Sequence, residues 1–249
     1  MASEAYNVIV VGAASGIGAA AARHLAEQGV RVYGVDRNAP GMIELADALK
    51  RAGHDAEAGV ADITDAESVR DAIAEIARKA GQIHGLVNCA GITGKTNIKA
   101  HDVSLEDFDH VYAINLRGAL VMTQEVLKHM LPHGYGRILH VASIAGKEGN
   151  AGMTAYSATK AGLIGLVKSM AKDYPETGIT INALAPAVIR TPLVDALPDA
   201  TVKYMTDKIP MRRVGELAEA AQMIAWIVSP ACSFTTGFTF DLSGGRATY

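Results

Sequence analysis

Short apolar runs alternate along the chain with longer, alanine-rich stretches of helical spacing. The run 7–12 (NVIVVG) is typical of a parallel strand that is covered on both faces of its sheet. The stretch 17–29 that follows ends at Gly29, a residue suited to a helix C-cap. Because the alternation continues along the chain, it predicts an α/β fold, a single doubly wound parallel sheet (Rossmann-like) with helices on both faces.

The pattern also predicts where the elements lie. Strands are expected at 7–12, 30–36, 55–62, 83–91, 136–143, 178–186 and 237–245, and helices at 17–29, 41–53, 65–81, 104–131, 154–174 and 216–228. No linker or repeat interrupts them, so residues 1–249 are expected to form one domain. The irregular segment 187–214 contains three prolines, Pro192, Pro198 and Pro210, and is interpreted as a flexible substrate flap.

Composition narrows the function classes. The net charge of −3 over 249 residues provides no basic field for nucleic acid, and no basic amphipathic segment indicates a membrane surface. The two cysteines, Cys89 and Cys232, lie far apart and belong to no Cys/His cluster, so neither a disulfide scaffold nor a metal site is expected. The N-terminus has no basic region before its short apolar run, which disfavours a signal peptide. A reduced, cytoplasmic setting is therefore expected.

A glycine-rich turn follows the first predicted strand. Gly12, Gly16 and Gly18 open the first helix, whose N-terminal N–H groups can bind a pyrophosphate. Such glycines can equally serve close packing of a helix on a sheet. Asp36 ends the second strand, where a carboxylate accepts hydrogen bonds from an adenosine ribose and repels a 2′-phosphate. This favours NAD over NADP, although the neighbouring Arg37 weakens the preference, and Asp36 can also be a simple turn residue.

Tyr156 and Lys160 lie one helical turn apart, beside many small residues. One interpretation is a half-buried tyrosine beside a solvated lysine. The other is an acid–base pair, in which the ammonium lowers the phenol pKa from its ordinary value near 10. Ser143, at the end of a predicted strand, is a suitable hydrogen-bond donor to a substrate oxygen.

Six motifs occur together in order: GAASGIG (12–18), NCAG (88–91), Asn115, Ser143, YSATK (156–160) and the terminal DLSGG. In this order and spacing the chain resembles the short-chain dehydrogenase/reductase family over essentially its whole length. The resemblance implies that Tyr156 is the general acid/base and that Lys160 tunes it and binds the nicotinamide ribose. It further implies that Ser143 polarises the reacting oxygen, and that Asn115 kinks its helix and helps to hold a proton-relay water.

The resemblance also implies a bound NAD. Its contacts would be Gly12, Ser15, Gly16, Ile17, Gly18, Asp36, Arg37, Asp62, Ile63, Asn88, Ala90, Gly91, Tyr156, Lys160, Ile189 and Thr191. Two positions depart from the family pattern: Val11 replaces a hydroxyl residue before the first glycine, and Ala187 replaces the glycine after Pro186. Neither departure touches the proton chemistry.

The substrate pocket is expected after Ser143, after Gly91 and under the flap. Its candidate residues are Ser143, Lys147, Glu148, Asn150, Met153, Tyr156 and Arg190. Charged groups there suit a small polyhydroxy acid better than a long acyl chain, because an apolar ligand leaves them unpaired. The alternative is that these loop charges face solvent.

The runs SIAGKEGN and DLSGGRATY resemble the sugar-acid and polyol branch of the family. The expected activity is carbohydrate catabolism: NAD-dependent interconversion of a secondary hydroxyl and a ketone, on a sugar acid such as a 2-keto-3-deoxy aldonate. A 3-oxoacyl-thioester (acyl carrier protein) reductase is the alternative, disfavoured by the acidic start of the helix at 104. A non-enzymatic NAD-binding protein is the third hypothesis. Family resemblance implies a homotetramer that packs through 104–131 and 154–174, in which the C-terminal RATY reaches a neighbouring subunit's active site.

Overall fold

The computed structural model describes residues 5–249, except for the side chains of residues 192 and 193. Residues 1–4, which belong to the N-terminus on which the signal-peptide expectation rests, lie outside the described residues. Among residues 5–249, no helix is both long enough and apolar enough to cross a membrane.

The described residues contain a seven-stranded sheet, in the order β3-β2-β1-β4-β5-β6-β7, whose neighbouring strands are all parallel. Its strands are β1 (Asn7–Val11), β2 (Arg31–Asp36), β3 (Ala56–Val60), β4 (Gly85–Asn88), β5 (Gly136–Val141), β6 (Ile179–Pro186) and β7 (Thr239–Leu242). The predicted doubly wound parallel sheet is therefore confirmed. Each strand lies within its predicted range.

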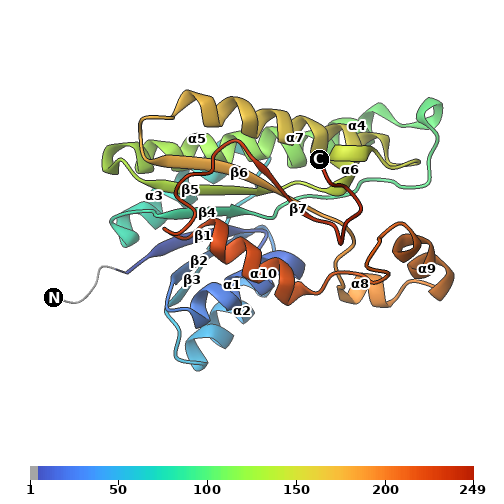
Figure 1. Cartoon of the computed structure of the whole chain (residues 1–249). Helices are drawn as coiled ribbons and strands as arrows, with labels where there is room; N and C mark the ends of the chain where they lie inside the picture. The colour runs from blue at the N-terminus through green and yellow to red at the C-terminus, as the bar shows by residue number, and fades with distance from the viewer. Residues whose placement is uncertain (1–4) are drawn as a thin grey trace.

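Helices cover both faces of this sheet (Figure 1). One face carries α1 (Gly16–Glu27), α2 (Ala39–Arg51) and α10 (Leu217–Ile227), and the other carries α3 (Ala66–Ala80), α5 (Gly118–Met130) and α7 (Thr154–Asp173). Strand β1 shows why helices are needed on both faces of the sheet. Val8 and Val10 pack into the cluster with α1, α2 and α10, while Ile9 and Val11 pack into the cluster on the opposite face. Because side chains alternate along a strand, a wholly apolar strand needs cover on both faces.

The predicted helix 104–131 is not continuous. It consists of α4 (Leu105–Tyr112), a π-helical turn η2 (Ala113–Arg117) and α5, followed by a short 3₁₀ turn η3 (Leu131–His133). Asn115 lies in the π-helical turn, in agreement with the expected distortion of its helix. Such turns occur frequently at functional sites because they displace a side chain from regular helical spacing.

The sequence pattern also missed four short elements. They are η1 (Ala100–Asp102), α6 (Ile144–Glu148), α8 (Pro192–Asp195) and α9 (Asp199–Asp207). The last two lie in the predicted flap, which is thus partly helical, while its flexibility stays a prediction. The first three are too short to give a recognisable periodicity, and α9 buries none of its residues, so no core-facing pattern marks it.

We expect the central strand to show the largest core effect. Ile9 is 0 % exposed, so Ile9→Ala should lower the free energy of unfolding by about 2–5 kcal/mol through lost burial and a residual cavity. Ile43 on α2 is 59 % exposed, and Ile43→Ala should change that free energy by less than about 0.5 kcal/mol. Urea unfolding of both variants measures the difference, and equal effects would contradict the assignment of the core.

Candidate active site and cofactor cavity

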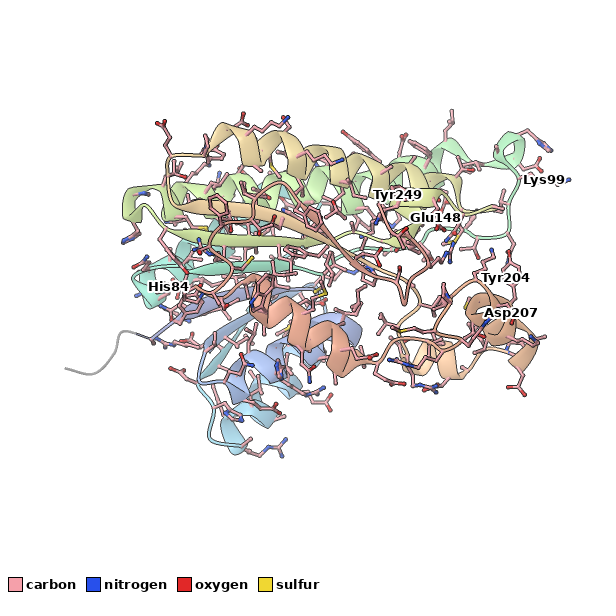
Figure 2. All side chains as sticks on the ribbon, in the orientation of Figure 1. His84, Lys99, Glu148, Tyr204, Asp207 and Tyr249 are labelled. Atoms are coloured by element: carbon pink, nitrogen blue, oxygen red, sulfur yellow. The ribbon has the colours of Figure 1, made fainter. Side chains whose placement is uncertain are left out.

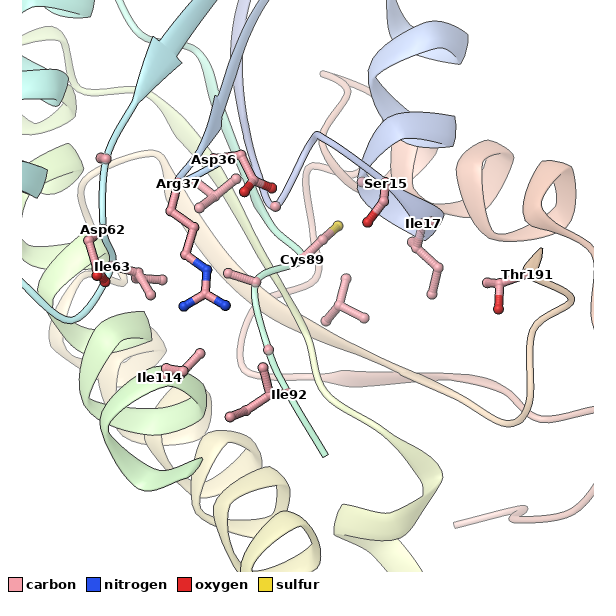
Figure 3. A pocket seen from close by; sticks show the side chains of 18 residues that line it. Ser15, Ile17, Asp36, Arg37, Asp62, Ile63, Cys89, Ile92, Ile114 and Thr191 are labelled. Carbon is pink, nitrogen blue, oxygen red and sulfur yellow. The ribbon is translucent and has the colours of Figure 1, made fainter. Parts of the chain in front are cut away.

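A cavity of about 430 Å³ opens at the carboxyl ends of the strands (Figure 3). Most of the residues expected to bind the cofactor line it: Gly12, Ser15, Gly16, Ile17, Gly18, Asp36, Arg37, Asp62, Ile63, Ala90, Gly91 and Thr191. Figure 3 shows Arg37, Asp62 and Ile63 at one end of the cavity and Thr191 at the other. An elongated cavity with this lining fits an extended dinucleotide.

The glycine turn after β1 leaves its backbone open to the cavity. Gly16 has a φ of 55° and its missing Cβ would point into open space, whereas a Cβ at Gly18 would overlap the carbonyl oxygen of Gly12. The N-cap of α1, Ser15, makes no side-chain hydrogen bond to the helix. The first N–H groups of α1 therefore remain available, and they fit the diphosphate of a dinucleotide.

Asp36 is held in place by two backbone N–H groups. Its Oδ2 accepts from Ala14 at 3.2 Å and its Oδ1 accepts from Asn38 at 2.9 Å. Each carboxylate oxygen can accept a further bond, so the group fits the ribose hydroxyls of NAD. The exposed Arg37 places a cation on the same cavity wall.

Asp62, after β3, is the second fixed acid. Its Oδ1 accepts from the backbone N–H of Thr64 at 2.9 Å and from the Thr64 hydroxyl at 2.7 Å. These bonds hold the Asp62 pKa below its ordinary value, so the carboxylate stays ionised. It is therefore ready to accept a hydrogen bond from an adenine amino group.

Four expected cofactor contacts do not line this cavity: Asn88, Tyr156, Lys160 and Ile189. Asn88 and Ile189 lie behind its wall. Asn88 is 3 % exposed, and its Oδ1 accepts from the N–H of Ala90 at 3.1 Å, which holds the turn that does line the cavity. Ile189 is also buried and forms a β-bridge with Gly215. Both residues support the wall in this structure, and direct contact with NAD stays a prediction.

Several lining residues were not predicted from the sequence: Val11, Ala61, Cys89, Ile92, Ile114 and Val141. All of these except Val141 adjoin a predicted site residue in the chain, so their neighbours were the available signal. Burial raises the pKa of the Cys89 thiol to about 12, which leaves it protonated. Cys89 thus contributes surface to the cavity and no thiolate.

Asn115 joins two segments of the site. Its Oδ1 accepts from the N–H of Ile92 at 2.8 Å, and its Nδ2 donates to the Ile92 carbonyl at 2.9 Å. The same Nδ2 donates to the Thr159 hydroxyl at 3.2 Å. Thr159 is one residue before Lys160, so the amide links the loop after β4 to the helix that carries the catalytic pair.

Lys160 is buried, with 4 % of its surface exposed, and its Nζ donates to the Val141 carbonyl at 2.7 Å. Burial lowers its pKa to about 8. The solvated lysine of the alternative interpretation is therefore wrong. Its Nζ lies 5.8 Å from the centroid of the Tyr156 ring, so the two side chains do share one region.

The expected lowering of the Tyr156 pKa by Lys160 is not observed. Burial raises the pKa of Tyr156, and the hydrogen bond with Ser143 opposes this rise. The ammonium donates to a strand-end carbonyl rather than to the phenol oxygen, which explains the difference. Ser143 Oγ in turn accepts from the N–H of Ala145 at 3.1 Å, so its O–H is free to donate to the phenol or to a substrate oxygen.

The charged candidates for substrate binding are paired within the chain. Lys147 bonds Asp241 at 3.1 Å, and Glu148 bonds Arg246 at 2.8 Å. Asn150 accepts from Arg246 at 3.0 Å and also donates weakly to the Met153 sulfur. These contacts are within one chain, so the tail is already engaged before any neighbouring subunit is considered.

Arg190 pairs with Asp195 and Glu216 on the protein surface. Together with the pairs at Lys147 and Glu148, this removes much of the net charge that the sequence pattern assigned to the substrate pocket. Ser143 and Tyr156 remain as the converging polar groups. Within residues 5–249, no three His, Cys, Asp or Glu side chains gather into a group that could hold a metal ion.

The buried Lys160 predicts a pH effect on stability. Its pKa is about 8 in the folded chain and near its ordinary 10.5 when unfolded, so the unfolded chain holds more protons between these values. Its contribution to the free energy of unfolding should therefore rise with pH over that window, by about 3 kcal/mol. Below pH 8 the lysine is protonated in both states. The full cost of burying its charge then lowers the free energy of unfolding.

Lys160→Met should remove this rise. The difference in unfolding free energy between the wild type and the variant, measured by urea titration at pH 7 to 10.5, should increase with pH. Lys168→Met is the matched control, because Lys168 is an exposed lysine on the same helix. A flat difference curve for Lys160→Met would show that the ammonium is not buried in solution.

Known proteins match this chain over the residues that form the site. Residues 12–247 match the family model described as enoyl-(acyl carrier protein) reductase. The chain is 42% identical over 242 residues to a 2-dehydro-3-deoxy-L-rhamnonate dehydrogenase (NAD(+)) from a Sphingomonas species, in a match that covers 97% of this chain and 95% of the relative. It is 37% identical over 243 residues to a 3-oxoacyl-(acyl-carrier-protein) reductase of Staphylococcus aureus, with 96% and 97% covered.

A solved structure gives the same fold. A variant of actinorhodin polyketide ketoreductase with NADPH superposes with a TM-score of 0.93 at 30% identity, and the match covers 100% of both chains. The relatives therefore match over nearly the whole length of the fold and the cavity. The chain belongs to the short-chain dehydrogenase/reductase family, and it is an oxidoreductase that acts on CH–OH groups.

Proposed function

We propose that this protein is an NAD-dependent dehydrogenase that oxidises a secondary hydroxyl of a sugar acid, such as a 2-keto-3-deoxy aldonate, to a ketone. The observation that supports NAD over NADP is the Asp36 carboxylate, which backbone N–H groups hold on the cavity wall. A carboxylate at this point accepts from a ribose and repels a 2′-phosphate. Arg37 opposes that preference only in part, because it is exposed and screened by solvent.

The substrate class is supported by a relative. The 42% identical protein is named for a 2-dehydro-3-deoxy sugar acid and for NAD. Small polar substrates also suit a site in which the reacting groups are a buried serine hydroxyl and a half-buried tyrosine phenol. An NAD preference favours the oxidative, catabolic direction.

Each catalytic side chain has a distinct part in the proposed reaction. In the oxidative direction the ionised phenol of Tyr156 accepts the proton of the substrate hydroxyl, while the Ser143 hydroxyl holds that oxygen by a hydrogen bond. A bound NAD would supply the hydride acceptor for that carbon. Because burial raises the Tyr156 pKa, the phenolate needs stabilisation, and the nearby buried cation of Lys160 can supply it once it leaves the Val141 carbonyl.

A 3-oxoacyl-thioester reductase is the second candidate. The 37% identical relative favours it, and the family-model description shares with it the acyl carrier protein but names an enoyl substrate. The start of α4 argues against docking of an acidic carrier protein, because Glu106 and Asp109 are exposed there and Asp107 lies beside them.

The third hypothesis is a binding protein without catalysis. Such a protein has no use for the assembled set of Asn115, Ser143, Tyr156 and Lys160, which disfavours this hypothesis.

We also propose the homotetramer that the family resemblance implies. Leu105 and Tyr112 on α4 are large apolar side chains that are 79 % and 43 % exposed in the single chain. A subunit contact through this helix would bury them, which supports packing through 104–131.

The substrate proposal is tested by absorbance at 340 nm with 2-keto-3-deoxy aldonates, polyols and simple secondary alcohols, each with NAD and with NADP. Turnover of a sugar acid, with NAD ahead of NADP, is expected. Asp36→Asn should narrow the NAD preference by roughly 10-fold or more, since it removes the charge that repels the 2′-phosphate. NADPH-dependent reduction of an acetoacetyl thioester, with no turnover of sugar acids, would favour the second candidate.

Tyr156→Phe should lower kcat by about 10²- to 10⁴-fold and leave the affinity for NAD nearly unchanged, because only the proton-transfer group is lost. Steady-state rates and NADH fluorescence measure the two quantities. Tyr135→Phe, the same change just before the amino end of β5 and so at the end of the strand opposite the cavity, should leave both unchanged. Full turnover by the Tyr156→Phe variant would refute the acid–base role.

A further inference from the structure

The C-terminal tail, residues 246–249, binds the segment that joins two catalytic residues. We call residues 144–155 the connecting segment, since they run from Ser143 to Tyr156. Arg246 Nε donates to Glu148 at 2.8 Å and Arg246 Nη2 donates to Asn150 at 3.0 Å. The Arg246 side chain is only 10 % exposed. A charge-assisted pair so shielded from water is stronger than a surface pair.

Tyr249 makes a second attachment (Figure 2). Its hydroxyl donates to the Lys147 carbonyl at 2.7 Å, and the Lys147 ammonium lies 5.0 Å from the centroid of its ring. Figure 2 shows Tyr249 and Glu148 close together. The tail therefore holds the connecting segment at consecutive residues, through side chains and through the backbone.

The tail itself is anchored to the sheet. Asp241 of β7 accepts from the N–H of Ser243 at 3.0 Å and also accepts from the Ser243 hydroxyl, while Ser243 Oγ accepts from the N–H of Ala247 at 3.1 Å. The other oxygen of Asp241 bonds Lys147. Through these hydrogen bonds the tail and the connecting segment are both attached to β7.

Both ends of the connecting segment lie at the reacting groups. Ser143 caps the start of α6 through Ala145, and α6 packs so closely on α7 that a Cβ at Gly146 would meet the Lys160 backbone at 2.6 Å. At the far end, the N–H of Asn150 donates to the Ser157 hydroxyl at 3.0 Å, next to Tyr156.

Between these fixed points the segment contains flexible residues. Gly149 and Gly152 have φ values of 73° and 74°, a region that glycine enters freely. Besides the tail, the bond that the Ile98 N–H donates to the Gly152 carbonyl at 3.3 Å holds this part of the segment, and the contacts of the tail add to it.

We propose that Arg246 and Tyr249 are positioning residues, which hold the connecting segment so that Ser143 and Tyr156 stay aligned on one substrate oxygen. The proposal rests on the catalytic roles given above and needs no particular substrate. In these contacts the tail engages the site of its own chain, and its expected reach into a neighbouring subunit's site stays a prediction.

Arg246→Met tests the proposal in the full-length protein. It should lower kcat by roughly 10- to 100-fold, because small misplacements of reacting groups are costly, while NAD affinity stays within about twofold. It should also raise the apparent pKa of the basic group in the pH–rate profile, since the Ser143 hydrogen bond lowers the Tyr156 pKa. A purely structural role would not move that value.

Arg78→Met is the matched control. Arg78 also bonds a glutamate, Glu75, through Nε and Nη2, but this pair is exposed on α3. It should leave kcat and the pH profile unchanged. If Arg246→Met fails to fold, Glu148→Gln removes the partner of the same pair and should give the same changes.

Hydrogen exchange provides a readout without substrate. Amides of residues 147–153 should exchange faster in Arg246→Met and in Tyr249→Phe, and amides of α1 should not change. If the wild type oxidises no substrate of the panel, the substrate proposal fails and exchange alone decides the role of the tail. Unchanged exchange, or faster exchange with wild-type kcat and pH profile, would overturn the positioning role.

Discussion

The organisation of the site depends on a buried ammonium group at the carboxyl end of β5. A charge removed from water needs hydrogen-bond partners, and the Val141 carbonyl is the partner that the strand end presents to Lys160. Space for the side chain comes from small neighbours, since a Cβ at Gly91 would come within 3.2 Å of the Lys160 Nζ. The small residues around the catalytic pair are thus a steric requirement of burying a lysine there.

The cofactor cavity follows from the strand order. β1 lies between β2 and β4, so the chain leaves β1 and β4 toward helices on opposite faces and a crevice opens between the two turns. The turn after β1 presents bare backbone N–H groups to this crevice, and the turn after β4 presents Ala90 and Gly91. The acids Asp36 and Asp62 end neighbouring strands, so both reach the same wall of the cavity.

Charge near the substrate is largely neutralised by pairs within the chain. Lys147, Glu148 and Arg190 each have an opposite charge within 3.2 Å. Ser143 and Tyr156 therefore remain as the converging polar groups at the predicted substrate site. This arrangement favours selection by hydrogen bonding and shape over selection by a strong local field.

The sequence by itself determined the α/β alternation, the approximate bounds of the strands and long helices, the glycine turn and the spacing of Tyr156 and Lys160. These features are local: periodicities of two and 3.6 residues, a helical turn, and residues at strand ends. Only the tertiary structure decided that Lys160 bonds Val141 and that Asn88 lies behind the cavity wall. The pairing of Arg246 with Glu148 likewise joins residues 98 positions apart. Contacts over such separations follow from the packing of whole elements, and no short pattern in the sequence encodes them.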